Sequence, residues 1–179
     1  MRHGGTTEFR YDPRTIGLHW AVAALVAALW CLGQSIDWFP RGLPRIGARS
    51  VHIVLGVALI ALVAARLRWR WSGGRRLPAQ LRVGAQRLGG AGHVLLYVLL
   101  LASLLLGLTN VWVRGDTIFQ LFSIPEFDPG NKELREQVGD LHALAVNALL
   151  ILAGVHAALA VFHHRVLKDG VLRRMLRAR

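Results

Sequence analysis

Cysteine and acidic residues are both scarce in this sequence. Cys31 is the only cysteine among 179 residues, which excludes an intramolecular disulfide. Aspartate and glutamate together number 10, against 22 lysines and arginines, so the net charge is +12. Internal repeats and low-complexity tracts are also lacking, which excludes repeat architectures. What remains is a chain whose basic residues and apolar residues occupy separate segments.

Apolar residues make up 54% of the chain and are gathered into long runs. The four longest cover Ile16–Gly33, Val51–Ala65, Gly92–Val113 and Leu141–Phe162. With flanking residues, each run reaches the roughly 20 residues that an α-helix needs to cross about 30 Å of hydrocarbon. The second run is the shortest, and it spans if the helix begins near Ile46 or if Arg66 and Arg68 snorkel toward the headgroups.

These runs predict an all-α integral membrane protein with a single domain over residues 1–179. We expect helices at about 15–36, 47–69, 91–113 and 139–164, in an antiparallel up-down bundle because the connections are short. Residues 131–137 are a candidate for a separate short surface helix. A cleaved signal peptide is the alternative for the first run, but the run is long for one and no small-x-small cleavage site follows it cleanly.

The basic residues set the predicted orientation. The N-terminal segment, the 66–90 loop and the C-terminal tail hold 16 of the 22, whereas the two other loops carry 6 basic residues alongside 7 acids. The positive-inside rule therefore predicts that both termini are cytoplasmic. On this basis the basic excess indicates contact with anionic membrane lipid, and nucleic acid is not expected as a partner.

Histidines are the polar residues that matter most inside the apolar runs. His142 and His156 are fourteen residues apart, which puts them on one helix face and about 21 Å apart along the axis. His19 lies near the cytoplasmic start of the first helix, at the depth of His156. His52 opens the second helix at the outer surface, at the depth of His142. The topology therefore predicts two pairs, one for each leaflet.

Two facing imidazoles suit bis-histidine ligation of a haem iron. Without such a partner, each polar ring in the hydrocarbon would cost free energy. Zinc is the rival metal, but a structural zinc site usually needs four ligands close together, and these pairs lie about 20 Å apart. We therefore predict His19 and His156 as ligands of an inner haem iron, and His52 and His142 as ligands of an outer one. A haem-free histidine transporter is a further hypothesis, although the helix interiors lack the carboxylates that it would favour.

The small residues Gly17, Gly56, Gly139 and Gly154 lie beside these histidines and would let a flat porphyrin approach. The absence of a C-x-x-C-H motif excludes the usual covalent attachment of a c-type haem.

The remaining histidines have weaker assignments. His163 follows His156 by seven residues on nearly the same stripe, so it either contacts a quinone or is structural. His93 either has a structural role or lies near the quinone, and a structural role is favoured. His3 and His164 are expected at the surface.

The histidine motifs resemble those of the bacterial cytochrome b561 family. They read IGLHW at 16–20, VHIVLG at 51–56, DLHALAVN at 140–147 and GVHAALAVFHHRVLKDGVLRRM at 154–175. The resemblance covers essentially the whole chain. It implies a four-helix, multi-pass protein of the bacterial inner membrane that binds two haem b groups and exchanges electrons with quinone. It also implies the same four ligands, and His163 as a quinone-site residue.

Within that family the sequence is similar to superoxide oxidases, which implies an oxidoreductase that takes electrons from superoxide outside and reduces ubiquinone. Arg41, Arg45 and Arg49 recur every four residues before His52, and if helical they form a cationic ridge that Arg114 could extend. Such a ridge would steer superoxide, or it would only anchor the protein to headgroups.

An alternative function keeps the haems: a membrane anchor subunit that relays electrons between a partner dehydrogenase or hydrogenase and quinone. The longer partner-binding tails or loops of such anchors are not seen in this sequence. The favoured interpretation therefore requires no protein partner.

Overall fold

The computed structural model describes residues 10–75, 77 and 83–176. Across these residues the chain forms four long helices, α1 (Pro13–Ser35), α2 (Leu43–Ser72), α3 (Val83–Arg114) and α4 (Lys132–Phe162). Shorter elements join or follow them: the 3-10 turns Ile36–Trp38 and Leu172–Met175, the strands β1 (Thr117–Ile118) and β2 (Phe122–Ser123), and a π-helical turn at His163–Leu167.

The long helices have the length and composition of membrane spans, within the stretches Pro13–Trp38, Leu43–Ser72, Gln86–Arg114 and Lys132–Leu167. Their outward faces carry large aliphatic side chains, and Leu105, Leu144 and Ile151 are each more than 60% exposed. Such a surface is stable in contact with lipid tails rather than water. The predicted all-α, four-helix membrane fold is confirmed.

All four helices begin earlier than predicted, and the difference is largest for α3 and α4. α3 starts at Val83 and α4 at Lys132, eight and seven residues before the predicted starts. Residues 131–137 are therefore not a separate surface helix but the N-cap and first turns of α4. The Asn131 side chain caps this helix by accepting a hydrogen bond from the Leu134 N–H at 3.0 Å. Polar first turns are invisible to a search for apolar runs.

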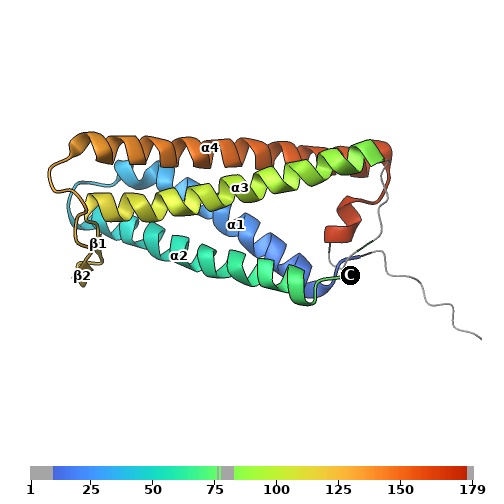
Figure 1. Ribbon diagram of the computed structural model, residues 1–179, viewed down its shortest axis with the longest axis horizontal. Coiled ribbons are helices and arrows are strands. Elements are labelled where there is room, and N and C mark those ends of the chain that lie inside the picture. The colour runs from blue at the N-terminus through green and yellow to red at the C-terminus, as the bar shows by residue number, and fades with distance from the viewer. Residues whose placement is uncertain (1–9, 76, 78–82, 177–179) are drawn as a thin grey trace, which may run out of the picture.

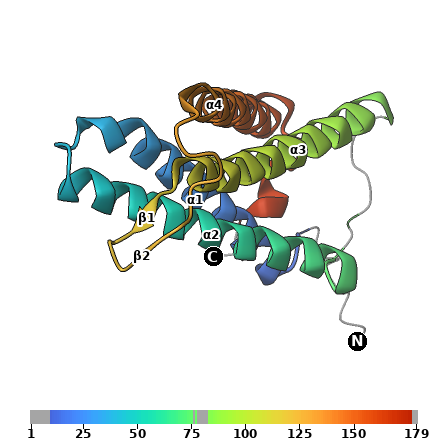
Figure 2. The ribbon, with the colours of Figure 1, turned by 60° about the vertical axis from the view of Figure 1, so that its left-hand side comes forward.

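The bundle consists of two antiparallel hairpins. α1 packs along α2, and α3 packs along α4, whereas the hairpins share few close backbone contacts with each other. Figure 1 places the α1–α2 and α3–α4 connections at one end, here called the loop end. The described residues nearest both termini lie at the opposite end, here called the terminal end, and Figure 2 shows the same arrangement from another side.

The hairpins meet through a buried aliphatic cluster near the middle of the helices. Its members come from every helix of the bundle: Val22, Leu29, Leu59, Val63, Leu100 and Leu149. A second tie crosses between the hairpins, where Trp30 Nε1 donates a hydrogen bond to Asn147 Oδ1 at 3.0 Å.

The short β1–β2 ribbon is fastened to α2 at the loop end. The strands pair antiparallel around a turn in which Phe119 and Gln120 have φ of 48° and 58°, as a type I′ hairpin turn requires. Ser50, which is fully buried, accepts a hydrogen bond from the Phe119 N–H at 2.9 Å. This bond holds the ribbon beside the part of α2 that carries His52.

Asp12 ties three segments together at the terminal end. Its carboxylate accepts hydrogen bonds from the Thr15 N–H at 2.9 Å, Trp69 Nε1 at 3.0 Å and the Arg75 N–H at 3.2 Å. Partial burial opposes the charge, but these bonds and one from the Thr15 hydroxyl outweigh it and lower the pKa of Asp12 to about 2.

Replacement of Asp12 by alanine is expected to destabilise the protein by about 1–2 kcal/mol, the range for loss of a helix N-cap. Because the folded-state pKa of about 2 lies below the ordinary 3.8, this stabilisation is present above about pH 4 and is lost as the pH falls toward 2. Thermal unfolding in detergent should therefore separate the two proteins at pH 7 and bring them together near pH 2. Glu136→Gln, an exposed change on α4, is the control; equal stability of Asp12→Ala and wild type at pH 7 would contradict the assignment.

Candidate metal-binding histidine pairs

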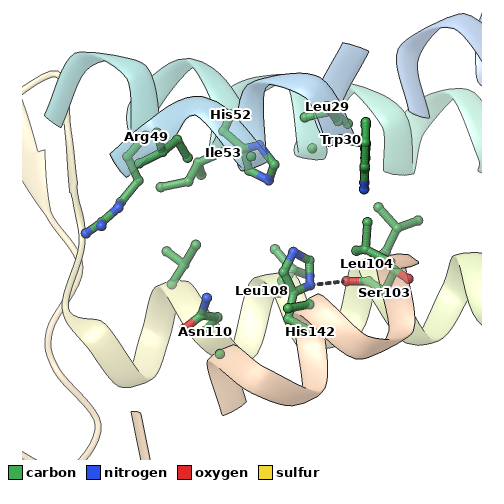
Figure 3. A pocket seen from close by; sticks show the side chains of 18 of the residues that line it. Leu29, Trp30, Arg49, His52, Ile53, Ser103, Leu104, Leu108, Asn110 and His142 are labelled. Carbon is green, nitrogen blue, oxygen red and sulfur yellow. Dashed lines mark hydrogen bonds between the residues drawn. The ribbon is translucent and has the colours of Figure 1, made fainter. Parts of the chain in front are cut away.

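His52 and His142 face each other across the loop end. His52 lies on α2 and His142 on α4, so the pair joins the two hairpins, and the ring centroids are 6.4 Å apart. Figure 3 shows the two imidazoles pointing into the space between the helices from opposite walls. A metal–imidazole bond is about 2 Å long and the ring centroid lies about 1 Å further, so two rings that share one metal have centroids about 6 Å apart. The loop-end pair meets this requirement.

Neighbouring backbone sets the orientation of the His142 ring. Its Nδ1 lies 3.0 Å from the Ser103 carbonyl oxygen, the bond drawn in Figure 3. A carbonyl only accepts, so Nδ1 carries the proton and Nε2 keeps its lone pair. This arrangement is usual for a metal-ligating histidine, in which the second ring nitrogen donates to a carbonyl or carboxylate.

Two glycines make room for the loop-end rings. A Cβ atom on Gly33 would lie 3.3 Å from His52 Cε1, and one on Gly107 would lie 3.1 Å from His142 Cε1. Both distances are tighter than ordinary van der Waals contact. The four glycines selected from the sequence differ, since a Cβ on any of them would meet no atom within 4 Å; they are Gly17, Gly56, Gly139 and Gly154. Proximity along the chain did not reveal which glycines touch the rings across helices.

A cavity of about 790 Å³ contains the loop-end pair. This volume is within the roughly 300–1,000 Å³ usual for cofactor and ligand sites. Its walls are mainly aliphatic, with Trp30 on one side, and charged side chains line the rest, including Asp37, Arg49 and Arg114. The residues present therefore suit a large, mainly apolar group with a metal at its centre.

Arg41, Arg45 and Arg49 do not form the single helical ridge expected from the sequence. Arg41 precedes α2, whose first residue is Leu43, and only Arg45 and Arg49 are helical. Arg49 pairs with Asp116 at 3.0 Å, and Arg45 pairs with Asp37 at 3.4 Å. The Arg45 guanidinium also donates to the Phe39 and Asp37 carbonyl oxygens. Two of the three charges are thus partly balanced by neighbouring acids.

His19 and His156 form the corresponding pair at the terminal end. His19 is on α1 and His156 on α4, and the ring centroids are 6.5 Å apart. His93 of α3 also approaches His156, with centroids 5.1 Å apart, and its Nδ1 lies 2.7 Å from the Gly89 carbonyl oxygen. Rings at 5.1 Å are too close to share a metal, so His19 and not His93 is the suitable partner. The contact of His93 with His156 was not expected from depth along the helices.

Sequence reasoning also missed a contact of Arg66 with the terminal-end pair. The Arg66 Nη2 lies 3.0 Å from His19 Nδ1. The sequence placed Arg66 at the end of an apolar run, where snorkelling toward the headgroups explains an arginine equally well. Across the described residues, no group of three or more histidine, cysteine or acidic side chains is arranged to hold a metal ion. The histidine pairs are therefore suited to a metal that brings its other ligands with it.

His163 lies beyond the end of α4 and is paired with Asp169. Its Nδ1 donates to the Asp169 carboxylate, and the chain turns back between them through Lys168, which has a φ of 53°. Partial burial of Asp169 favours its neutral form, but hydrogen bonds from His163 and the Val171 N–H outweigh it and lower the pKa of the carboxyl group. His164 is partly buried, and His3 lies outside the described residues.

Known proteins resemble this chain over nearly its whole length. A family model described as prokaryotic cytochrome b561 matches residues 10–178. The chain belongs to this family. Membership makes the protein a membrane electron-transfer protein with haem b as its cofactor, and a multi-pass protein of the bacterial inner membrane.

Several relatives align along nearly their whole length. "Probable superoxide oxidase CybB" of Yersinia pestis is 29% identical over 172 residues, which cover 93% of this chain and 96% of that protein. "Cytochrome b561 homolog 1" of Escherichia coli K12 is 28% identical, with 93% and 97% covered. "Cytochrome b562" of Cereibacter sphaeroides is 31% identical, with 97% and 99% covered. The resemblance to the cytochrome b561 family drawn from the histidine motifs is thereby confirmed.

Proposed function

We propose that the chain holds two haem b groups and works as a superoxide:ubiquinone oxidoreductase. His52 and His142 hold the haem at the loop end, which faces outward, and His19 and His156 hold the one at the terminal end, which faces the cytoplasm. The observation that carries this proposal is the pair of ring separations, 6.4 Å and 6.5 Å, at opposite ends of one membrane bundle. The printed name of the Yersinia pestis relative supports superoxide as the donor.

When bound, the haem groups supply one-electron redox chemistry. His52 with His142, and His19 with His156, would hold these groups. The aliphatic side chains that line much of the loop-end cavity suit the apolar face of such a group. Two superoxide anions each lose one electron and leave as dioxygen, while one ubiquinone gains both electrons and takes up two protons.

The loop-end cavity offers an anionic substrate the guanidinium groups of Arg49 and Arg114, which line it together with His52 and His142. The lining as a whole is balanced in charge: its basic residues are Arg49, Arg114, Lys132 and Arg135, and its acidic residues are Asp37, Asp116, Glu136 and Asp140. The charges of Arg49 and Arg114 act over a short range, because Asp37 and Asp116 lie on the same wall and salt screens distant charges. We assign Arg49 and Arg114 to the attraction of superoxide. We assign Arg41 and Arg45 to the same role, because they line a smaller hollow together with Arg49.

At the cytoplasmic end we assign His163 to the quinone. Asp169 accepts the proton of His163 Nδ1 and so fixes the ring orientation. The opposite ring nitrogen, Nε2, is then the one that can hold a hydrogen bond or proton for a quinone oxygen. The π-helical turn that carries His163 is a local irregularity of a kind often found at functional sites.

His19→Ala and His52→Ala are each expected to remove a different haem, because either change deletes one of two axial ligands. Haem b per polypeptide, measured as the pyridine haemochrome, should fall to about half of the wild-type value in each variant. His93→Ala should retain both haems, since its ring is too close to His156 to share a metal. Loss of a haem in His93→Ala, or full retention in His19→Ala, would contradict the assignment.

Superoxide should reduce the purified, oxidised protein. Xanthine and xanthine oxidase generate the anion, growth of the reduced haem absorption is followed, and superoxide dismutase should abolish that growth. Arg49→Gln with Arg114→Gln should slow the reduction several-fold at low salt, because the cavity loses its local positive charge. Arg68→Gln with Arg70→Gln, two exposed changes at the terminal end, is the charge-matched control.

Haem that stays oxidised, or that is reduced equally with superoxide dismutase present, rules out superoxide as the donor. In that case a soluble dehydrogenase subunit that co-purifies stoichiometrically and reduces the haem would support the anchor-subunit alternative.

His163→Ala should slow the oxidation of the reduced haems by ubiquinone at least tenfold, because the quinone loses its hydrogen-bonding partner. Reduction by superoxide in a single turnover should be unchanged. His164→Ala, the adjacent ring, should behave as the wild type in both measurements. Equal quinone kinetics in His163→Ala and wild type would remove His163 from the quinone site.

A further inference from the structure

We propose that Arg66 binds a propionate carboxylate of the haem held by His19 and His156, and that it raises the reduction potential of that haem. The inference rests on the ligand assignment of the proposed function. It concerns a contact at the terminal end, between Arg66 and His19, that is incompatible with a metal on His19.

Arg66 carries a positive charge inside a membrane-spanning segment of α2 and is only partly exposed. Across the described residues, its guanidinium forms no ion pair with an aspartate or glutamate. Its contacts are the His19 ring at 3.0 Å and the Tyr97 ring, whose centroid is 5.5 Å from the guanidinium carbon. A charge in the hydrocarbon normally has an ionic partner or faces water. Arg66 therefore lacks the anion that its position calls for.

Tyr97 gives an independent indication of a missing acceptor. Its hydroxyl is buried and has no hydrogen-bond partner among the described residues. A buried hydroxyl without a partner costs about 1–3 kcal/mol, so native structures rarely leave one in that state. The same hydroxyl belongs to the ring that Arg66 covers. One carboxylate could accept hydrogen bonds from both side chains.

The bond between Arg66 and His19 cannot persist once His19 ligates iron. A guanidinium only donates, so His19 Nδ1 accepts in this contact and the ring proton is on Nε2. A histidine that binds iron through Nε2 carries its proton on Nδ1, which donates to an acceptor. Arg66 must therefore release Nδ1 and take another acceptor. Haem b brings its own, in the form of propionate carboxylates.

An arginine at this place has a consequence for the direction of electron flow. A fixed positive charge favours the reduced haem, which carries one positive charge fewer than the oxidised form. Arg66 thus raises the reduction potential of the terminal-end haem above the value that this haem would have without it. A higher potential there favours the transfer of electrons toward the end that holds His163.

Redox titration of the purified holoprotein, followed by haem absorption, tests the inference. Arg66→Gln should retain both haems and lower the midpoint potential of one, by at least a tenfold change in its reduced-to-oxidised ratio, which is about 59 mV for one electron. The other haem should not shift. Arg66→Lys should lower the potential of the first haem by less than Arg66→Gln does, and Tyr97→Phe should also lower the potential of that haem. Arg68→Gln, an exposed change two residues along α2, is the matched control and should shift neither.

Reconstitution of the apoprotein with haem b dimethyl ester separates a propionate contact from a general effect of charge. With the ester, the difference in potential between wild type and Arg66→Gln should be much smaller, because the carboxylate that holds the guanidinium beside the haem is absent. If Arg66→Gln does not fold, Arg66→Lys and Tyr97→Phe give the comparison: each should lower the potential with haem b and lower it less with the ester.

Unshifted potentials in an Arg66→Gln protein with both haems present would overturn the inference and leave the ligand assignment intact. A shift that persists unchanged with the ester would also overturn it. Failure of His19→Ala to remove a haem is the separate result that would overturn the proposed function.

Discussion

The structure depends on one distance, the separation of about 6 Å between imidazoles that belong to different helical hairpins. α1 and α2 form one hairpin and α3 and α4 the other, and a buried aliphatic cluster joins them only near the middle of the bundle. At both ends the hairpins stay far enough apart for two rings to face each other at 6.4 Å or 6.5 Å. If the hairpins packed more closely, side chains would fill the space between the two rings. If they packed further apart, the two rings of a pair could not bind one metal.

The hydrocarbon environment makes every polar group between the hairpins costly unless it has a partner. His142 meets the Ser103 carbonyl, His93 meets the Gly89 carbonyl, and Trp30 meets Asn147 across the two hairpins. Arg66 and Tyr97 do not follow this pattern, because an arginine rests on a histidine and a buried hydroxyl has no acceptor among the described residues. Asn110 Oδ1, in the lining of the loop-end cavity, is likewise buried without a partner among the described residues. Arg66 and Tyr97 differ from it because they lie against each other and beside His19, and this combination points to one shared anionic ligand.

The membrane fold was predictable because apolar run length is a one-dimensional property. Each run predicted a span, and family membership and the helices agree with that prediction. The helix starts were less predictable, since the polar first turns of α3 and α4 continue helices whose apolar parts begin later. The orientation of the termini stays a prediction from the positive-inside rule, and haem ligation by the four histidines stays a prediction from depth and ring separation.

The sequence by itself determined the spans and the depth of each histidine, because burial in a bilayer and the 1.5 Å rise per helical residue are both read along the chain. It could not determine lateral neighbours, which depend on how the helices rotate and pack against one another. Only the tertiary structure decided that Gly33 and Gly107 touch the loop-end rings and that His93 approaches His156 too closely to share a metal. The contact of Arg66 with His19 was decided in the same way, by the packing of α2 against α1.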